Sequence, residues 1–312
     1  MRLIKEKTSI DFLGPTRRRI ALALSVLFVV ASLVSLATRG LEMGIDFTGG
    51  ILLEVGYPQA ADLESIRIRM VDVGYSNAQV QLFGEDDVVL VRLPPMDGNI
   101  DSIRMQLQET LQAGDPNTDL RRVEFVSPQV GSELAEQGAL AMIFALLMIF
   151  LYVMFRFQWK FSAGAVVALA HDAIVTVGFF SIFGLPFDLT VVAAVLAVIG
   201  YSLNDTVVAF DRIRENFFGL RGKSAEETIN ISINEMLART LITGVTTLLV
   251  LVALLVLGGE SIAPFSIALI VGVVVGTYSS IYTASATALA LNVNAQDLIE
   301  PIKDTSLIDD LP

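Results

Sequence analysis

The sequence predicts a multi-span α-helical membrane protein with six transmembrane helices and one α+β domain inserted between helices 1 and 2. Of the 312 residues, 54% are hydrophobic and 17% are charged, whereas soluble domains are usually about 45–50% apolar and about 25% charged. The apolar residues gather into six blocks that are too long for the core helices of a soluble protein. A polar segment, residues 41–134, separates the first two blocks and carries 16 acidic and 6 basic residues.

Each apolar block is long enough to cross a hydrocarbon core of ~30 Å as a helix that rises ~1.5 Å per residue. The blocks cover residues 20–37, 138–155, 161–183, 189–210, 241–257 and 265–291. We therefore expect an N-terminal segment at 1–19, a first transmembrane helix at 20–37, a five-helix membrane domain at 138–291 and an acidic tail at 292–312. The first block is longer than the apolar core of a typical signal peptide, so we interpret it as an uncleaved anchor.

Lysine and arginine predict the orientation. They gather before the first block, in the turn near residues 156–160 and in the loop near residues 212–239, whereas the turns near Gly184 and Gly258 carry none. The positive-inside rule places both termini and the basic loops in the cytoplasm and residues 41–134 outside. Within the basic loop, residues 224–237 have an amphipathic pattern, and we expect them to lie along the inner membrane surface.

The inserted segment alternates between two periodicities. Short apolar or alternating runs predict strands at 51–55, 79–83, 88–93 and 120–126, and helical spacing predicts helices at 60–73 and 100–111. The resulting order, βαββαβ, is that of the split-βαβ or ferredoxin-like arrangement. We expect two helices to cover one face of a four-stranded sheet.

Composition also excludes several classes of function. The chain has no cysteine and one histidine, which excludes disulfides, thiolate metal sites and sites that need several imidazoles. Its net charge of −12 argues against nucleic-acid binding, because little basic charge is present to offset phosphate repulsion. We expect no metal and no bound cofactor.

Ionisable residues inside the apolar blocks are the candidate site. Asp205 lies seven residues before Arg212, roughly 10 Å inside the end of the fourth block. A carboxylate at that depth costs ~2.5–3.5 kcal/mol on insertion scales. Asp205 therefore has two possible roles. It is a protonatable group of a proton relay, with Asn204 beside it to hydrate both the charged and the neutral form, or it makes a structural hydrogen bond to a neighbouring helix. We predict that Asp205 is the principal protonatable group.

His171 and Asp172 lie near the middle of the third block. Adjacent residues on a helix point about 100° apart, so both cannot face one partner squarely. Two interpretations stay open for each residue, a proton relay or a hydrogen bond between helices.

Two patterns of small residues are structural candidates. Gly44–Gly50 is rich in glycine, but a phosphate cradle would need a following lysine and helix, so we interpret it as a tight link into the first strand. Gly272, Gly276 and Ser280 in the sixth block have the spacing that favours close helix packing, and a seam with a partner subunit is one candidate for this contact.

Several motifs occur in a fixed order along this chain. They are Met43–Gly50 with its signature residues Gly44, Asp46, Phe47, Thr48, Gly49 and Gly50, then Val130–Leu134, Ala170–Asp172, Gly200–Thr206 with Phe210–Asn216, and Arg239–Thr243. In this order, on six spans with one external domain, the chain resembles the SecF family of bacterial protein-export membrane subunits. The resemblance covers nearly the whole chain.

This family is similar to one half of the resistance-nodulation-division (RND) transporters. The resemblance implies that the protein is not an enzyme. It implies that the protein uses the proton gradient of the bacterial inner membrane to promote the translocation and release of unfolded exported polypeptides. This activity follows the ATP-driven step of export. The resemblance implies a partner, SecD, that supplies six further spans, together with the SecYEG channel and its ATPase SecA. It also implies that Arg239 is the counter-charge of Asp205, although Arg239 fits equally well as a cytoplasmic arginine at the membrane surface.

Two other functions remain as alternatives. The chain fits half of a proton-driven RND-type exporter of small molecules, which would need a second six-span half. It also has two intramembrane carboxylates, Asp172 and Asp205, as an intramembrane aspartyl protease would, but the Gly-x-Gly-Asp pattern of such enzymes is absent.

Overall fold

The structure is a computed structural model that describes residues 9–95, 100–156, 159–220, 222–259 and 262–293. Six of its helices are long and apolar enough to cross a membrane, which confirms the six predicted spans. They are α1 (Pro15–Thr38), α5 (Pro128–Arg156), α6 (Trp159–Phe183), α7 (Leu189–Gly219), α8 (Ala225–Leu257) and the series α9 (Ala263–Ser279), η2 (Ser280–Ala284) and α10 (Ser285–Ala290). Of the predicted terminal segments, residues 1–8 and 294–312 lie outside the described part.

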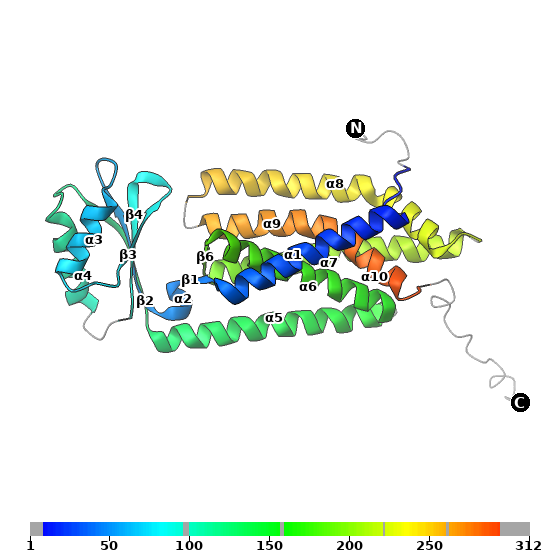
Figure 1. Ribbon diagram of the computed structural model, residues 1–312, viewed down its shortest axis with the longest axis horizontal. Helices are drawn as coiled ribbons and strands as arrows, with labels where there is room; N and C mark the ends of the chain where they lie inside the picture. Colours follow the sequence, from blue (N-terminus) through cyan, green and yellow to red (C-terminus); the bar gives the residue numbers. More distant parts are fainter. Residues whose placement is uncertain (1–8, 96–99, 157–158, 221, 260–261, 294–312) are drawn as a thin grey trace, which may run out of the picture.

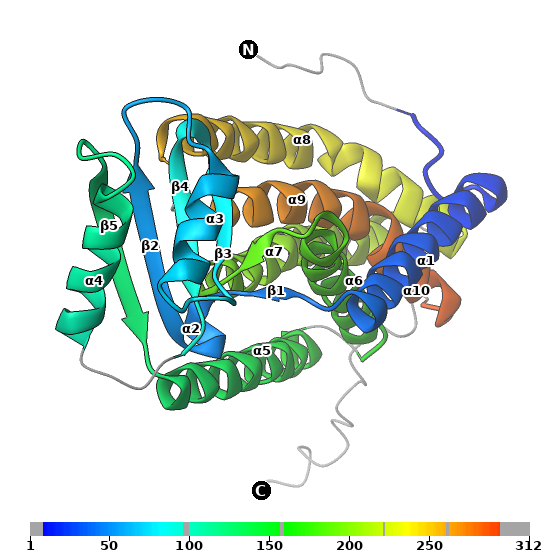
Figure 2. The same cartoon turned by 60° about the vertical axis from the view of Figure 1, so that its left-hand side comes forward.

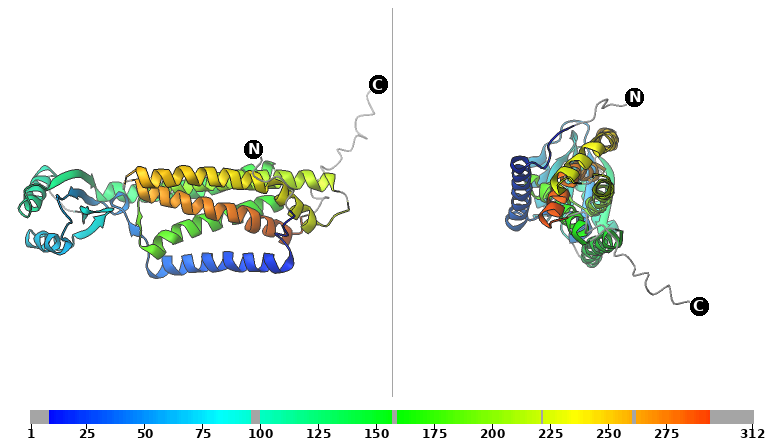
Figure 3. Two further views of the ribbon diagram at one scale, coloured as in Figure 1. Left: turned by 90° about the horizontal axis from the view of Figure 1, so that it is seen from above. Right: turned by 90° about the vertical axis from the view of Figure 1, so that its right-hand side faces the viewer.

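The six helices lie side by side in an elongated bundle, and a small sheet domain sits at one end of it (Figure 1). The start of α1 and the end of α10 both lie at the opposite end of the bundle. Seen from above and end-on, α1 lies at the periphery of the bundle (Figure 3). The chain is thus a multi-pass membrane protein in which one domain projects beyond the spans.

Local capping sets where several helices begin. Pro15 occupies the first turn of α1, where its missing N–H costs nothing. The Asp188 carboxylate accepts a hydrogen bond from the Val191 backbone N–H at 3.0 Å at the start of α7. Ser224 and Glu227 form a capping box that opens α8. Each cap satisfies backbone donors that the first helical turn leaves unpaired.

The prediction that residues 224–237 lie along the inner membrane surface is wrong. These residues form the start of α8, which continues without a break into its apolar half. Their apolar face, including Ile229 and Ile233, packs in one buried cluster with Phe210 of α7 and Leu13 from the N-terminal segment. A neighbouring helix can bury the apolar side of an amphipathic segment as well as a lipid surface can. Here α7 buries it, because α7 continues as far as Gly219 and so runs alongside the start of α8.

The sheet domain lies between α1 and α5 in the chain. Its elements follow in the order β2 (Gly50–Gly56), α3 (Leu63–Asp72), β3 (Gln79–Phe83), β4 (Glu85–Leu93), α4 (Ile100–Gln112) and β5 (Asp119–Val126). The four strands form one antiparallel sheet in the order β3-β4-β2-β5. This is the sequence of strands and helices that the periodicity predicts.

The two faces of this sheet differ. In β2, Ile51, Leu53 and Val55 are buried in a core with residues of α3 and α4. Leu52 and Glu54 point to the other face, since side chains alternate along a strand. Figure 2 shows that α3 and α4 lie on the side away from the bundle. The uncovered face is therefore turned toward the ends of the membrane helices.

A short link connects the bundle to the sheet. After α1, β1 (Glu42–Met43) pairs in parallel with β6 (Pro186–Phe187), which joins α6 to α7. The chain then forms α2 (Ile45–Thr48) and enters β2 through Gly49 and Gly50, whose φ angles are +70° and +127°. These angles favour glycine, and a Cβ on Gly49 would also lie 2.8 Å from the Pro128 backbone. The glycine-rich run is thus a tight link that packs against the start of α5.

Candidate functional site

A completely buried carboxylate lies in the middle of the bundle. Asp172 has no exposed surface, and it lies 13 residues after the start of α6 at Trp159, which is ~20 Å along the helix. Its Oδ2 atom accepts hydrogen bonds from Ser202 Oγ of α7 at 2.6 Å and from Ser279 Oγ of α9 at 2.7 Å. Asp172 therefore ties three helices together at mid-depth.

The hydroxyl of Ser279 has a second acceptor. Ser279 Oγ also lies 3.2 Å from the Gly276 carbonyl oxygen one turn earlier in α9. A serine hydroxyl has one proton to donate, so it bonds either to Asp172 or to Gly276. If a proton bound to Asp172 Oδ2, this atom would donate a hydrogen bond to one of the two serine oxygens. The hydroxyl of that serine would then need another acceptor, and for Ser279 the Gly276 carbonyl oxygen is available.

His171 lies against the same carboxylate. Its Nδ1 atom is 3.0 Å from Asp172 Oδ1, and both side chains are almost entirely buried. His171 Nε2 is buried without a hydrogen-bond partner in the described part of the chain. The imidazole ring lies 6.4 Å from the ring of Tyr278 in α9. The His-Asp pair thus forms one hydrogen-bonded unit in which the second ring nitrogen has no partner among the described residues.

Asp205 occupies a neighbouring part of the interior. It lies three residues after Ser202, which places both on the same side of α7. Its Oδ1 atom accepts a hydrogen bond from Thr240 Oγ1 of α8 at 2.8 Å, and the side chain is half-buried. A small cavity of about 10 Å³ lies beside it, with Thr240 and Ser280 in its lining. That volume is about the size of one water.

The other residues predicted around Asp205 lie differently. Arg239 is exposed, and among the described residues no ion pair within 4.0 Å joins it to Asp205. Their interaction is a longer-range electrostatic one. Asn204 is exposed on α7 and lies outside the hydrogen bonds described above. Asp172 and Asp205 have separate partners, so the structure does not show the shared-proton dyad that an aspartyl protease needs.

Asp172, His171 and Asp205 with their serine and threonine partners form a polar layer inside the bundle, and further hydroxyl groups extend it. Thr206 Oγ1 of α7 lies 2.9 Å from Ser280 Oγ, where α9 passes into the π-helical turn η2. Single π-helical turns inside α-helices are frequent at functional sites. On the α1 side, Ser25 Oγ lies 3.3 Å from Tyr278 Oη and 3.2 Å from Thr283 Oγ1. The layer therefore reaches from α1 through α6, α7 and α9 to α8.

The small residues of α9 face α7 of the same chain. A Cβ on Gly272 would overlap the side chain of Val198, and a Cβ on Gly276 would lie 3.1 Å from Ser202 Cβ and 3.5 Å from Asp172 Oδ2. Gly276 thus leaves room for the hydrogen bonds around Asp172. The expected use of this face as a seam with another subunit is wrong, because α7 already covers it.

The predicted signature link holds on to the segment that joins α6 to α7 as well as to the start of α5. Asp46 Oδ2 accepts a hydrogen bond from the backbone N–H of Leu189 at 3.0 Å, and Phe47 stacks on Phe187 with ring centroids 6.0 Å apart. Among the described residues, no group of three or more His, Asp or Glu side chains is placed to hold a metal ion.

Comparison with known proteins agrees with this arrangement. The family model "Protein export membrane protein SecD/SecF, C-terminal" matches residues 106–294, and the model "SecD/SecF GG Motif" matches residues 34–61. The chain belongs to the SecD/SecF family. The protein translocase subunit SecF of Pseudomonas aeruginosa is 50% identical over 97% of this chain and 98% of its own length. SecF of Vibrio alginolyticus is 45% identical over 99% of each.

Solved structures give the same family. A crystal structure of SecDF from Thermus, described as a translocon-associated membrane protein, superposes with a TM-score of 0.84 at 36% identity over 94% of this chain. SecDF in a super-membrane-facing form superposes with a TM-score of 0.69 over the same share. This chain covers 40% of each SecDF chain, so it corresponds to less than half of those proteins.

Sequence reasoning missed two residues that bind the intramembrane carboxylates. Ser279 is central to the contacts of Asp172, but a single serine in an apolar helix gives no signal by itself. Thr240, the hydrogen-bond donor to Asp205, is likewise not among the predicted site residues. The weak signal available was the spacing of Gly276 and Ser280, because Ser279 lies beside Ser280 and one turn after Gly276.

Proposed function

We propose that this chain is a subunit of the bacterial Sec protein-export machinery and couples proton movement to polypeptide translocation and release after the ATP-driven step. The observation that carries the proposal is the complete burial of Asp172 between three helices. Intramembrane carboxylates are costly and usually mark ion or proton pathways. Asp172, His171 and Asp205 are the protonatable groups of the relay, and Arg239 modulates Asp205 from the exposed surface of α8.

Protonation changes how the helices are held together. The ionised Asp172 carboxylate accepts hydrogen bonds from both Ser202 and Ser279. The neutral acid instead donates a hydrogen bond to one of these serines, which then no longer donates to Asp172. Two discrete helix arrangements that differ by one proton are what a rocking transporter half needs. One elementary charge that moves through 100 mV releases ~2.3 kcal/mol, which shifts such an equilibrium by roughly 50-fold.

The partner is a second six-span subunit. This chain corresponds to 40% of the solved SecDF chains, and we infer that SecD supplies the remaining spans, with SecYEG and SecA as further partners and unfolded exported polypeptides as substrate. Half of an RND-type exporter of small molecules remains the alternative. Co-purification of a SecD-like subunit with the Sec channel would support the first function, and drug efflux by the purified complex would support the second.

We also propose an orientation with both termini in the cytoplasm of a bacterial cell and the sheet domain outside the inner membrane. The strand order β3-β4-β2-β5 with both helices on one face supports a ferredoxin-like external domain. Because the chain has no native cysteine, a cysteine at Ser9 should resist an impermeant thiol reagent in intact cells, and a cysteine at Ser76 should react. Labelling at Ser9 would overturn this orientation.

The decisive experiment measures gradient-dependent translocation in inverted membrane vesicles that contain the complete complex. Asp172→Asn and Asp205→Asn keep the shape of the side chain but cannot exchange a proton, so each should remove most of the stimulation by the proton gradient and leave ATP-driven transport intact. Asp211→Asn, in the exposed part of α7, is the matched control. Full stimulation in both Asp172→Asn and Asp205→Asn would refute the proposal, and loss in only one assigns the principal carboxylate.

A further inference from the structure

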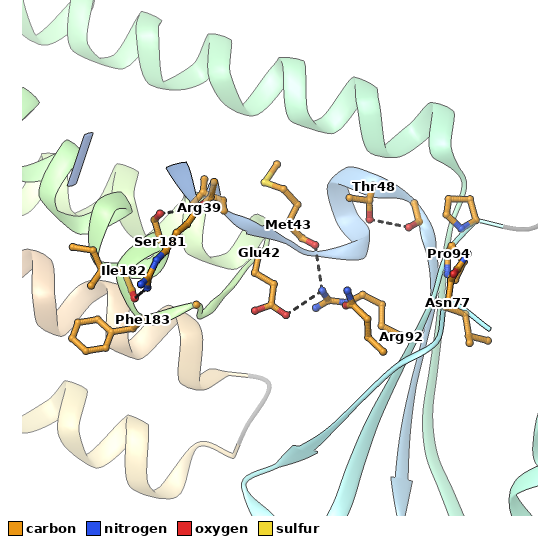
Figure 4. Close-up of a pocket in the computed structure, with 17 residues that line it drawn as sticks. Arg39, Glu42, Met43, Thr48, Asn77, Arg92, Pro94, Ser181, Ile182 and Phe183 are labelled. Atoms are coloured by element: carbon orange, nitrogen blue, oxygen red, sulfur yellow. Dashed lines mark hydrogen bonds and ion pairs between the residues drawn. The ribbon is translucent and has the colours of Figure 1, made fainter. Parts of the chain in front are cut away.

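A cavity of about 790 Å³ lies between the sheet domain and the bundle, outside the polar layer described above. Figure 4 shows its walls. One wall is the link from Arg39 to Met43, another is the uncovered face of the sheet at Arg92, and the third is the end of α6 at Ile182 and Phe183. Its volume lies in the range of small-molecule sites, about 300–1,000 Å³.

Arg92 is the polar centre of this cavity. Its side chain is only 15% exposed, and in the described part of the chain its Nε–H is buried without an acceptor. Its Nη1 donates to the Met43 carbonyl oxygen at a long 3.4 Å. An arginine has five N–H donors, and those that are buried are normally satisfied. Arg92 is therefore placed to bind an additional anionic oxygen ligand.

A carboxylate forms a long ion pair with this arginine at the cavity wall. Glu42 Oε1 lies 3.8 Å from Arg92 Nη1, too far for a hydrogen bond, and the Glu42 side chain is 34% exposed. Figure 4 shows Glu42 reaching from the link toward Arg92, with Arg39 at the other end of the cavity beside Ile182. A purely anionic ligand on Arg92 would meet Glu42, whereas a zwitterion would satisfy both.

The cavity lies where two of the membrane-spanning helices end. α1 ends at Thr38 and α6 ends at Phe183, so the membrane-spanning segments stop at this wall. Ile182 and Phe183 are 37% and 63% exposed, which gives the cavity an apolar rim beside the hydrocarbon region. A ligand with a polar zwitterionic head and an apolar body fits this combination of wall and rim.

We propose that this cavity binds the headgroup of a zwitterionic phospholipid with a primary ammonium group, such as phosphatidylethanolamine. The phosphodiester oxygens accept hydrogen bonds from the guanidinium N–H groups that Arg92 presents to the cavity, and the ammonium donates to Glu42. The acyl chains leave over Phe183 into the bilayer. Since the lipid touches the link, the sheet and α6 together, it helps to set how the sheet domain sits on the bundle, whether or not the bundle carries protons.

The test is native mass spectrometry of the full-length chain in detergent, titrated with single lipids. The wild-type protein should bind phosphatidylethanolamine more tightly than phosphatidylglycerol, which lacks the ammonium, and than phosphatidylcholine, whose quaternary ammonium cannot donate a hydrogen bond. Arg92→Gln should weaken phosphatidylethanolamine binding about tenfold, the effect of one lost charge-assisted hydrogen bond. Arg104→Gln, exposed on α4, should bind as the wild type does.

Glu42→Gln separates this site from a general effect of misfolding. Removal of the carboxylate should erase the preference for phosphatidylethanolamine and raise phosphatidylglycerol binding, a gain that an unfolded protein cannot show. Equal binding of all lipids by the wild type, or equal loss in Arg92→Gln and Arg104→Gln, would overturn the proposal. Free phosphoethanolamine that binds as tightly as the lipid, or a photo-crosslinker at Gln79 that captures a polypeptide instead of a lipid, would also overturn it.

Discussion

The contact between α7 and α9 allows a sharp test of the packing that holds the buried carboxylate. Gly272 of α9 lies against Val198 of α7, and a Cβ at Gly272 would fall 2.6 Å from Val198 Cγ1, 2.9 Å from Val198 Cβ and closer still to Val198 Cγ2. Carbon atoms pack best at about 3.5–4.0 Å. Gly272→Ala therefore forces the two helices apart by about 1 Å, because a valine in a helix has one strongly preferred rotamer and cannot swing away.

The expected cost follows from two opposing effects. Overpacking a tight interface typically costs about 1–3 kcal/mol, and the overlap with three atoms of one stiff side chain places Gly272→Ala near the upper end. Alanine recovers about 1 kcal/mol of helix propensity relative to glycine. We expect the free energy of unfolding to fall by about 2 kcal/mol. The same movement lengthens the bonds from Ser202 and Ser279 to Asp172, so gradient-driven translocation should fall as well.

Unfolding by a denaturing detergent, followed through the fluorescence of the single tryptophan, Trp159, measures this change. Gly200→Ala is the matched control, since a Cβ there meets nothing within 4 Å, and it should be neutral or slightly stabilising. Val198→Ala should rescue Gly272→Ala with a coupling of at least about 1 kcal/mol, because it removes the overlapping atoms. Additive effects within about 0.5 kcal/mol would show that the two side chains do not collide.

Two further predictions concern the sheet domain and the N-terminal segment. Hydrogen bonds from the Ser65 hydroxyl and backbone N–H hold the pKa of Asp62 below its usual range. The Asp62 cap therefore stabilises α3 fully at a pH above the usual carboxyl pKa, and this stabilisation is lost as the pH falls through the lowered pKa. Amide exchange in α3 should show this pH dependence in the wild type but not in Asp62→Asn, and equal profiles would contradict the cap. Asn234 binds the backbone N–H and carbonyl oxygen of Ile10 at 2.8 and 2.7 Å, so Asn234→Ala should speed exchange at Ile10 about tenfold and leave α3 unchanged. Unchanged exchange at Ile10 would show that other contacts hold this segment.

The sequence by itself determined the six spans and the order of strands and helices in the inserted domain. Both are local properties, since a hydrophobic block or a period-two pattern specifies an element without reference to the rest of the chain. The resemblance carried by the motifs near Gly44, Asp172 and Asp205 also gave the SecD/SecF family. The pattern at residues 224–237 misled, because an amphipathic face does not reveal whether lipid or another helix covers it.

Only the tertiary structure decided which of these polar residues meet. Asp172 is enclosed because Ser202 and Ser279, 30 and 107 residues away in the chain, approach from two other helices, and that approach depends on how α7 and α9 pack at Gly272 and Gly276. Contacts of this kind arise from side-chain volumes on three helices at once, and no local pattern records them. The structure likewise separated Asp205 from a direct ion pair with Arg239, because the arginine stays at the exposed surface of α8.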